Sequence, residues 1–317
     1  MPFQWLRRAL LTAACVSPLL LAACGGGSVV SEFNPDRLVV FGDAFADAGQ
    51  RGTRYTINNG GINWTEQLAA SYGLSIQPSA GGGSSYAIGS ARVTSKPDAA
   101  GNAATPTIAE QIDTFLASES PAGGDLILVA GGVADIIAEG AALIAGNQDE
   151  AQATANVEAA GRALGAQVRR LVDAGAQHVA VAGPYNLGRS PWARSTGREG
   201  VLESLTTRFN DELLISIVDL GAKVLYIDAA LHINLVTADG GNATYGFDDV
   251  TSVLCNSVDP GPGIGIGAGQ VNSALCNGGT LGGANLETTL FADPVYFAPK
   301  GHTTLGDYAY DRLRERW

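Results

Sequence analysis

Residues 38–49 read Leu38-Val39-Val40-Phe41-Gly42-Asp43-Ala44-Phe45-Ala46-Asp47-Ala48-Gly49. Four apolar residues followed by a Gly-Asp pair are typical of a strand that is buried on both faces and ends in a loop. Three more runs of this kind follow along the chain: Leu126–Val129, Val179–Val181 and Val224–Ile227. The sequence therefore predicts several buried strands, with functional residues just after their carboxyl ends.

Amphipathic stretches separate these runs. Two have apolar residues at helical spacing: Val157, Leu164, Val168, Leu171 and Val172 in one, and Leu202, Leu205, Phe209, Leu213 and Ile217 in the other. We interpret both stripes as core packing. Strands that alternate with helices indicate a parallel sheet covered by helices on both faces.

The first 23 residues are typical of a signal peptide: Arg7 and Arg8 precede an apolar run from Ala9 to Ala23. The alternative is a buried first helix, which the Gly-Gly-Gly-Ser that follows Cys24 makes less favourable. Leu21-Ala22-Ala23-Cys24 resembles the bacterial lipobox, which implies a lipidated Cys24 and a membrane as partner. Residues 24–36 would form a flexible tether. Gly25 after the cysteine implies the outer membrane of a Gram-negative bacterium.

Composition excludes several classes of function. The chain has 31 acidic and 19 basic residues among 317, a net charge of −12, so a nucleic-acid partner is not expected. Three His and four Cys give little material for a metal site, and we expect no cofactor. The alternating glycines from Gly261 to Gly269 neither follow a predicted strand nor end in Lys-Ser/Thr, so they do not form a nucleotide loop.

Two cysteines remain once Cys15 leaves with the signal peptide and Cys24 is assigned to lipid. Cys255 and Cys276 lie in a long irregular stretch from about residue 234 to 290. In an exported protein we expect them to form a disulfide, which would contribute about 3 kcal/mol by closing the loop. Two free thiols are the alternative.

The stretch after the first strand, residues 40–49, resembles the first block of the GDSL (SGNH) esterase and lipase family. Further matches follow in order: 85–91 resembles block two, Gly132–Asp135 block three, and Asp293–Tyr296 falls where the family has Asp-x-x-His. The resemblance covers residues 37–317. It implies one domain with a three-layer α/β/α, flavodoxin-like parallel sheet of about five strands, and activity as a carboxylic-ester hydrolase.

The catalytic positions of that family carry different residues in this chain. Ala44 replaces the nucleophilic Ser, Ala134 replaces the Asn that stabilises the oxyanion, and Tyr296 replaces the His base. A methyl group cannot attack a carbonyl, and a phenol with a pKa of about 10 is a poor base at neutral pH. Of the side chains in the family's catalytic set, only that of Asp293 is retained.

Block two gives the family a backbone N–H for the oxyanion. Ser90 is its counterpart here, with Gly89 if the register shifts by one residue. Because this role needs only a backbone N–H, a residue other than Gly at this position could still donate to the oxyanion. Asp43 is expected to cap or orient its loop and to take no part in proton transfer.

Three hypotheses follow. In the first, the protein has lost hydrolase chemistry and is a binding or structural module at the envelope, whose cleft would hold an acyl or ester ligand. The second is an active carboxylic-ester hydrolase with a rearranged group such as Ser90 with His302. The third is an inactive scaffold whose cleft is filled. His302 itself is expected to be a partly exposed residue near the start of the last helix.

Overall fold

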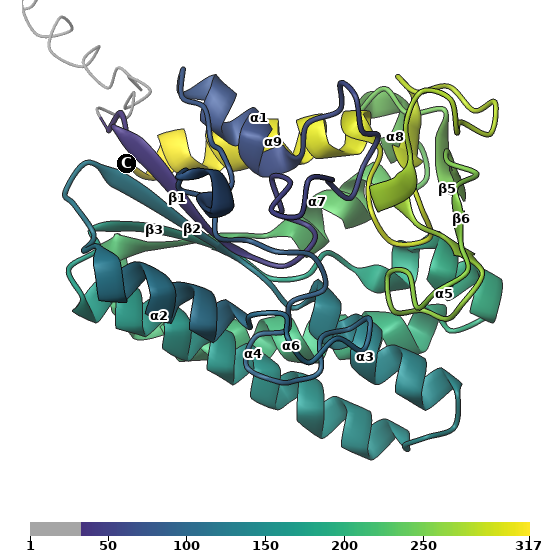
Figure 1. Cartoon of the computed structure of the whole chain (residues 1–317), viewed down its shortest axis with the longest axis horizontal. Helices are drawn as coiled ribbons and strands as arrows, with labels where there is room; N and C mark the ends of the chain where they lie inside the picture. The colour runs from purple at the N-terminus through teal and green to yellow at the C-terminus, as the bar shows by residue number, and fades with distance from the viewer. Residues whose placement is uncertain (1–32) are drawn as a thin grey trace, which may run out of the picture.

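The computed structural model describes residues 33–317, and a parallel four-stranded sheet lies at its centre (Figure 1). The expected signal peptide and Cys24 lie outside the described residues. The strands pair in chain order, and each contains one of the four predicted apolar runs. They are β1 (Arg37–Gly42), β2 (Asp125–Ala130), β3 (His178–Ala182) and β4 (Val224–Ile227).

A short extended segment runs along the free edge of β1. The Val40 N–H donates to the Ser84 carbonyl, and the N–H groups of Tyr86 and Ile88 donate to the carbonyls of Val40 and Gly42. The helical turn η1 (Ser79–Gly81) precedes this segment and Ser90, at φ +64°, ends it, so it is too short for regular strand pairing. The central sheet thus has four strands rather than about five. With this segment counted, the spatial order is the flavodoxin-like 2-1-3-4-5.

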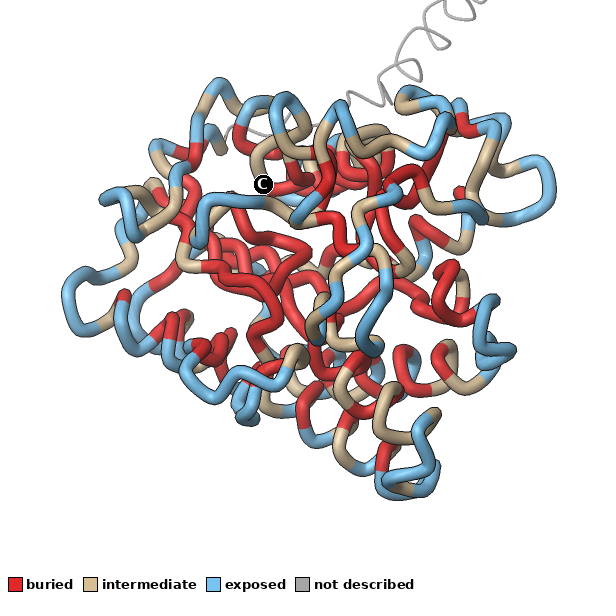
Figure 2. The backbone as a smooth tube through the Cα atoms, turned by 45° about the vertical axis from the view of Figure 1, so that its right-hand side comes forward, coloured by how far each residue is buried: buried red, intermediate tan, exposed pale blue. Residues whose placement is uncertain are grey.

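Helices cover both faces of the sheet, which confirms the three-layer architecture (Figure 1). On one face lie α1 (Trp64–Ser71), α7 (Ala229–Val236) and α9 (Pro299–Arg316). On the other lie α2 (Ile108–Ser118), α3 (Val133–Ile144), α4 (Glu150–Asp173) and α6 (Glu199–Ile217). Two short helices, α5 (Pro191–Thr196) and α8 (Gly241–Thr244), lie in the connections. Buried segments follow the strands and the inward sides of the helices (Figure 2).

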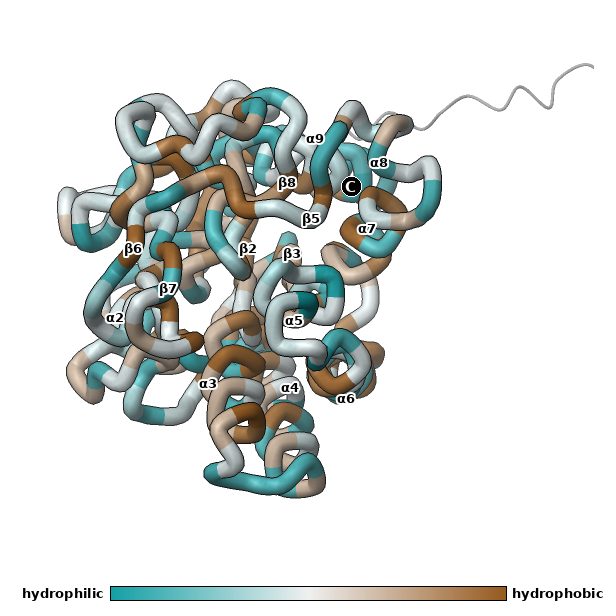
Figure 3. Tube along the Cα trace, turned by 90° about the vertical axis from the view of Figure 1, so that its right-hand side faces the viewer, coloured by the Kyte–Doolittle hydropathy of each residue, from teal (hydrophilic) through white to brown (hydrophobic). Residues whose placement is uncertain are grey.

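The two longest helices pack against each other through the predicted stripes. The α4 stripe is buried except for the half-buried Val172, and the α6 stripe is entirely buried. The α6 helix carries both hydrophobic and hydrophilic residues (Figure 3). Gly161 permits the close approach of the helices, because a Cβ there would lie 2.3 Å from the Phe209 carbonyl oxygen.

The stretch from 234 to 290 is more ordered than predicted. It contains β5 (Asp249–Val253), which pairs with β8 (Thr289–Phe291), and the small antiparallel pair β6 (Val258–Asp259) and β7 (Gln270–Val271). The Cys255–Cys276 disulfide is present, with a Cα–Cα distance of 6.0 Å. We call residues 254–288 the disulfide excursion; it lies at the end of the molecule opposite the chain's C-terminus (Figure 1).

The last residues of the predicted tether belong to the folded domain. The Phe33 ring stacks on His178 with centroids 3.7 Å apart, and the Phe33 N–H donates to the Trp317 carbonyl. The Asp36 N–H donates to Gly124. A tether that ends at residue 36 is therefore too long, because an aromatic anchor at Phe33 docks the chain before the first strand begins.

Candidate functional site

The loop after β1 is fastened to the start of α3 by Asp43. One Asp43 carboxylate oxygen accepts from the Phe45 N–H at 3.0 Å and the other from the Ala134 N–H at 3.2 Å. These bonds bring Ala44 and Ala134 together at the carboxyl ends of β1 and β2, and both alanines are buried. Burial raises the pKa of Asp43 to about 7, against the lowering effect of its backbone donors. Asp43 therefore organises the backbone of this site.

The block-two segment is held in the same way by Asp47. Its carboxylate accepts from the N–H groups of Gly49 and Gln50 on one oxygen and from Gly89 at 2.8 Å on the other. Ser90 adopts φ +64°, a backbone conformation that favours glycine. The amide of Gly89 is thus committed to Asp47 and is not free to bind an oxyanion.

Tyr55 covers this segment. A Cβ on Gly89 would lie 2.2 Å from the Tyr55 hydroxyl oxygen, so the phenol rests directly on the glycine. Burial raises the pKa of Tyr55 to about 12, with the neighbouring Asp47 charge adding to the shift and a hydrogen bond with Ser90 opposing it. The hydroxyl of Ser90 therefore faces a neutral phenol.

Asp293 is saturated by main-chain donors. It accepts from the N–H groups of Val295 at 2.8 Å, Tyr296 at 2.7 Å and Ser273 at 2.9 Å. Burial raises its pKa to about 6. Asp293 shapes the turn before α9 and ties it to the disulfide excursion, where the family's Asp would orient a histidine.

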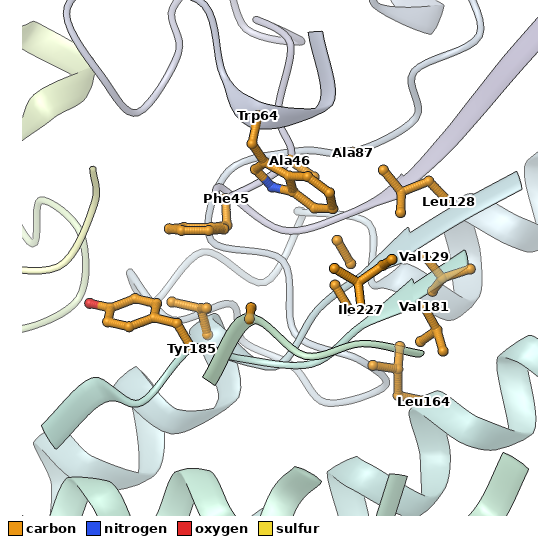
Figure 4. Packing of buried hydrophobic residues seen from close by; sticks show 14 of the residues in the cluster. Phe45, Ala46, Trp64, Ala87, Leu128, Val129, Leu164, Val181, Tyr185 and Ile227 are labelled. Carbon is orange, nitrogen blue, oxygen red and sulfur yellow. The ribbon is translucent and has the colours of Figure 1, made fainter. Parts of the chain in front are cut away.

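Tyr296, predicted to stand where the family has its His base, is buried among aromatic rings. Its side chain is 1% exposed, and its ring centroid lies 5.0 Å from that of Tyr55 and 6.2 Å from that of Phe45. Phe45 in turn packs against Tyr185 and Phe297, with centroids 5.6 and 4.8 Å away. Figure 4 shows Phe45 and Tyr185 among the closely packed apolar side chains of this region. Burial keeps the pKa of Tyr296 well above its ordinary value, so this side chain remains a neutral phenol that is packed among other rings.

A cavity of about 10 Å³, room for about one water molecule, lies beside Asp43, Phe45 and Trp64. Ala44, Ala134 and Tyr296 are not part of its lining. These three residues are themselves 2%, 0% and 1% exposed. Their burial favours the alternative in which the cleft is filled over a cleft that holds an acyl ligand.

His302 is a packing and hydrogen-bonding residue. It is fully buried, which corrects the expectation of partial exposure, because it faces α1 from the second turn of α9. Its Nδ1 accepts from the Trp64 N–H at 3.3 Å, and its Nε2 lies 3.4 Å from the Tyr55 carbonyl oxygen, to which it can donate as the neutral tautomer. Burial lowers its pKa to about 4. Both ring nitrogens are thereby engaged by backbone groups.

No rearranged serine–histidine pair is assembled. Among residues 33–317, no hydrogen bond joins a serine hydroxyl to a histidine ring, and Ser90 associates with Tyr55. His178 stacks on Phe33, and His232, which lies on α7, stacks on Tyr308 with centroids 4.7 Å apart.

Neither a metal centre nor a spanning helix is found in the described part of the chain. No three His, Cys, Asp or Glu side chains there are grouped so that they could hold a metal ion. Over the same residues, every helix is too short or too polar to cross a bilayer.

The residues that close the site were not identified from the sequence. Tyr55, Tyr185 and Phe297 lie in irregular segments without periodicity, so no pattern marks them as partners of Phe45 and Tyr296. The aromatic Phe45 directly after Ala44 was the one available sign that this loop is apolar.

Comparison with known proteins places these features in a family. A family model described as GDSL-like Lipase/Acylhydrolase matches residues 38–309. A solved structure of a member of the lipolytic protein G-D-S-L family from Veillonella parvula is 12% identical; the match covers 87% of this chain and 96% of that chain, with a TM-score of 0.43. A second solved structure is 14% identical over 89% and 98% of the two chains, with a TM-score of 0.42. No curated protein matches the chain.

Proposed function

The chain belongs to the GDSL-like lipase/acylhydrolase family, and on that premise we propose that it is a non-catalytic member that serves as a structural module of the bacterial envelope, anchored by lipid on Cys24. The observation that carries this proposal is that Ala44, Ala134 and Tyr296 stand at the three positions where we expect the family's catalytic side chains, and that all three are buried.

The chemistry of acyl transfer supports the proposal. Ala44 offers no nucleophile, Ala134 no side-chain donor for the oxyanion, and Tyr296 no group that takes a proton at neutral pH. In a serine hydrolase, loss of the nucleophile or the base costs about 10⁶-fold in turnover, and loss of one oxyanion donor about 10²- to 10³-fold. Any one of these replacements would reduce hydrolysis severely, and this chain has all three.

The filled site favours a structural over a ligand-binding role. An acyl chain would have to displace Tyr296, whose ring is buried against Tyr55 and Phe45. The alternative, an active ester hydrolase, is favoured by family membership alone and requires His302 to release Trp64 and Tyr55 before it could serve as a base.

The test is hydrolysis of p-nitrophenyl acetate and butyrate by the purified protein. We expect no turnover above a mock preparation, and the same result for Ser90→Ala. Saturable hydrolysis that Ser90→Ala or His302→Asn abolishes, with the variant still folded, would establish the alternative.

A reversion experiment separates missing chemistry from altered shape. The variant Ala44→Ser, Ala134→Asn and Tyr296→His restores the family's catalytic residue types. Hydrolysis by this variant, absent when Ala44 is left unchanged, would show that the scaffold still forms an acyl site. The lipid anchor is tested separately by mass spectrometry of the N-terminal peptide, with Cys24→Ser as its control.

A further inference from the structure

An apolar groove lies at the edge of the sheet, at the end of the strands opposite the filled site. We call it the α6–β4 groove; it has a volume of about 440 Å³ and its lining includes Leu214, Ile215, Val218, Gly221, Val224 and Tyr226. These residues come from the end of α6, from the turn η3 (Val218–Lys223) and from the edge strand β4. Leu214 is 40%, Ile215 66% and Val218 79% exposed. Large apolar side chains gathered at an exposed groove indicate a surface that is covered in use.

The described chain begins beside this groove. The Phe33 N–H donates to the Trp317 carbonyl at 3.2 Å, and the Trp317 indole donates to the Ala222 carbonyl at 2.8 Å. Ala222 lies between Gly221 and Val224, which both line the groove. Whatever precedes Phe33 therefore leaves the domain on the face that carries the α6–β4 groove.

The rim of the groove has the residue types of a membrane interface. Arg316 donates to the Gly221 carbonyl at 3.1 Å, Lys223 follows in η3, and Trp317 and Tyr226 flank the apolar side chains. Basic residues and amphipathic aromatic rings of this kind favour the headgroup region of a bilayer.

Charges of both signs surround the groove. Asp219 and Glu315 are each paired with an arginine, and Lys223 and Arg316 lie in η3 and at the end of α9. The carboxylates of Asp211 and Asp228 interact electrostatically with the groove-lining Tyr226. Attraction of this surface to a bilayer therefore depends on its apolar side chains and interfacial aromatic rings.

We propose that the α6–β4 groove is a membrane-docking surface: Leu214, Ile215 and Val218 insert into the headgroup and acyl boundary, and Trp317 and Tyr226 lie at the level of the headgroups. This proposal is compatible with the anchor proposed on Cys24, because the nine peptide steps from Cys24 to Phe33 span at most about 30 Å. The anchor would hold this face toward the bilayer, and the groove would fix the orientation of the domain on it. Docking by the groove does not itself require lipidation.

The test uses residues 25–317, which retain every described contact and lack Cys24. Vesicles of phosphatidylethanolamine and phosphatidylglycerol are sedimented with the protein, and the partition coefficient is measured. We expect the unaltered protein to bind these vesicles, and the partition coefficient to be about tenfold or more lower for Leu214→Ser, Ile215→Ser and Val218→Ser combined.

The matched control is Val258→Ser with Leu275→Ser, which removes two exposed apolar side chains from the disulfide excursion. We expect it to bind like the unaltered protein, with near-UV circular dichroism showing that both variants are folded. Absence of vesicle binding, or equal binding by the groove variant, would overturn the proposal.

A concentration-dependent dimer in sedimentation velocity that the groove substitutions abolish would overturn it too, since the groove would then bind a second copy. These outcomes are independent of the ester assay and of the mass of the N-terminal peptide. Failure of docking is therefore distinguishable from failure of the proposed function.

Discussion

Removal of the Tyr296 side chain should destabilise the protein and open a cavity where the family has its catalytic base. The ring is 1% exposed and packs against Tyr55 and Phe45. Replacement of a buried aromatic residue by Ala costs about 3–5 kcal/mol, which includes the lost transfer free energy and the cavity left behind. We therefore expect Tyr296→Ala to lower the free energy of unfolding by about 3–5 kcal/mol, a large part of a typical total of about 5–15 kcal/mol.

Urea unfolding followed by tryptophan fluorescence measures this change, with Tyr296→Phe as the control that retains the ring. We expect the Phe variant to lose about 1 kcal/mol or less. The cavity in the Ala variant should accept p-cresol, the shape of the missing side chain, and p-cresol at 100 times its Kd would restore about 2.7 kcal/mol. A loss below about 1 kcal/mol for Tyr296→Ala, or equal stabilisation of both variants by p-cresol, would refute the view that Tyr296 plugs the site.

Three further predictions concern stability. Cys255→Ser with Cys276→Ser should lower the free energy of unfolding by about 3 kcal/mol without altering the central sheet, as followed by urea unfolding and far-UV circular dichroism. His232 is buried with no hydrogen-bond partner on either ring nitrogen, and burial lowers its pKa from 6.5 to about 4. Because the unfolded chain takes up the proton first, the part of the folding free energy that comes from keeping His232 neutral is lost as the pH falls from about 6.5 to 4. We expect His232→Phe to reduce the loss of stability between pH 7 and 4.5 by up to about 3 kcal/mol. Burial raises the pKa of Asp43 from 3.8 to about 7 and that of Asp293 from 3.8 to about 6. The folded protein therefore holds these two protons at pH values where the unfolded chain has lost them. The stabilisation of the folded state that results declines as the pH rises from about 4 to 7. Asp43→Asn should flatten that decline by up to about 1.4 kcal/mol per pH unit in unfolding measured from pH 5 to 8.

The architecture was predictable because it depends on patterns that are local in the sequence. Leu38–Phe41 is apolar at every position, as a strand buried on both faces requires, and it forms the middle of β1. The stripe on α6 keeps helical spacing and is buried against α4. The cysteine pairing followed from the small number of cysteines and the expected compartment.

The interior of the site was only partly predictable, because it depends on contacts between distant segments. Tyr55 reaches Gly89 and Tyr296 from an irregular stretch, and no periodicity connects these three positions. His302 was expected to be partly exposed because it lies near a helix start, yet α1 packs over that turn and buries it. Phe33 likewise anchors the chain through contacts with His178 and Trp317, which lie 145 and 284 positions further along the sequence.

A physical distinction separates three buried aspartates of this region from the residues at positions 44, 134 and 296. Asp43, Asp47 and Asp293 each accept two or three hydrogen bonds from buried backbone N–H groups. Removal of such a carboxylate would leave those donors unsatisfied, at about 1–3 kcal/mol each, whether or not the protein cleaves a substrate. The side chains at positions 44 and 134 accept no hydrogen bond from a backbone N–H, so a change of residue there leaves no donor unsatisfied. Methyl groups there are buried without a polar penalty, and a tyrosine at 296 adds apolar burial that a solvated catalytic histidine would not. On the proposed non-catalytic role, loss of catalysis and burial of these positions would favour each other, because side chains that need not meet a substrate can be packed by apolar groups.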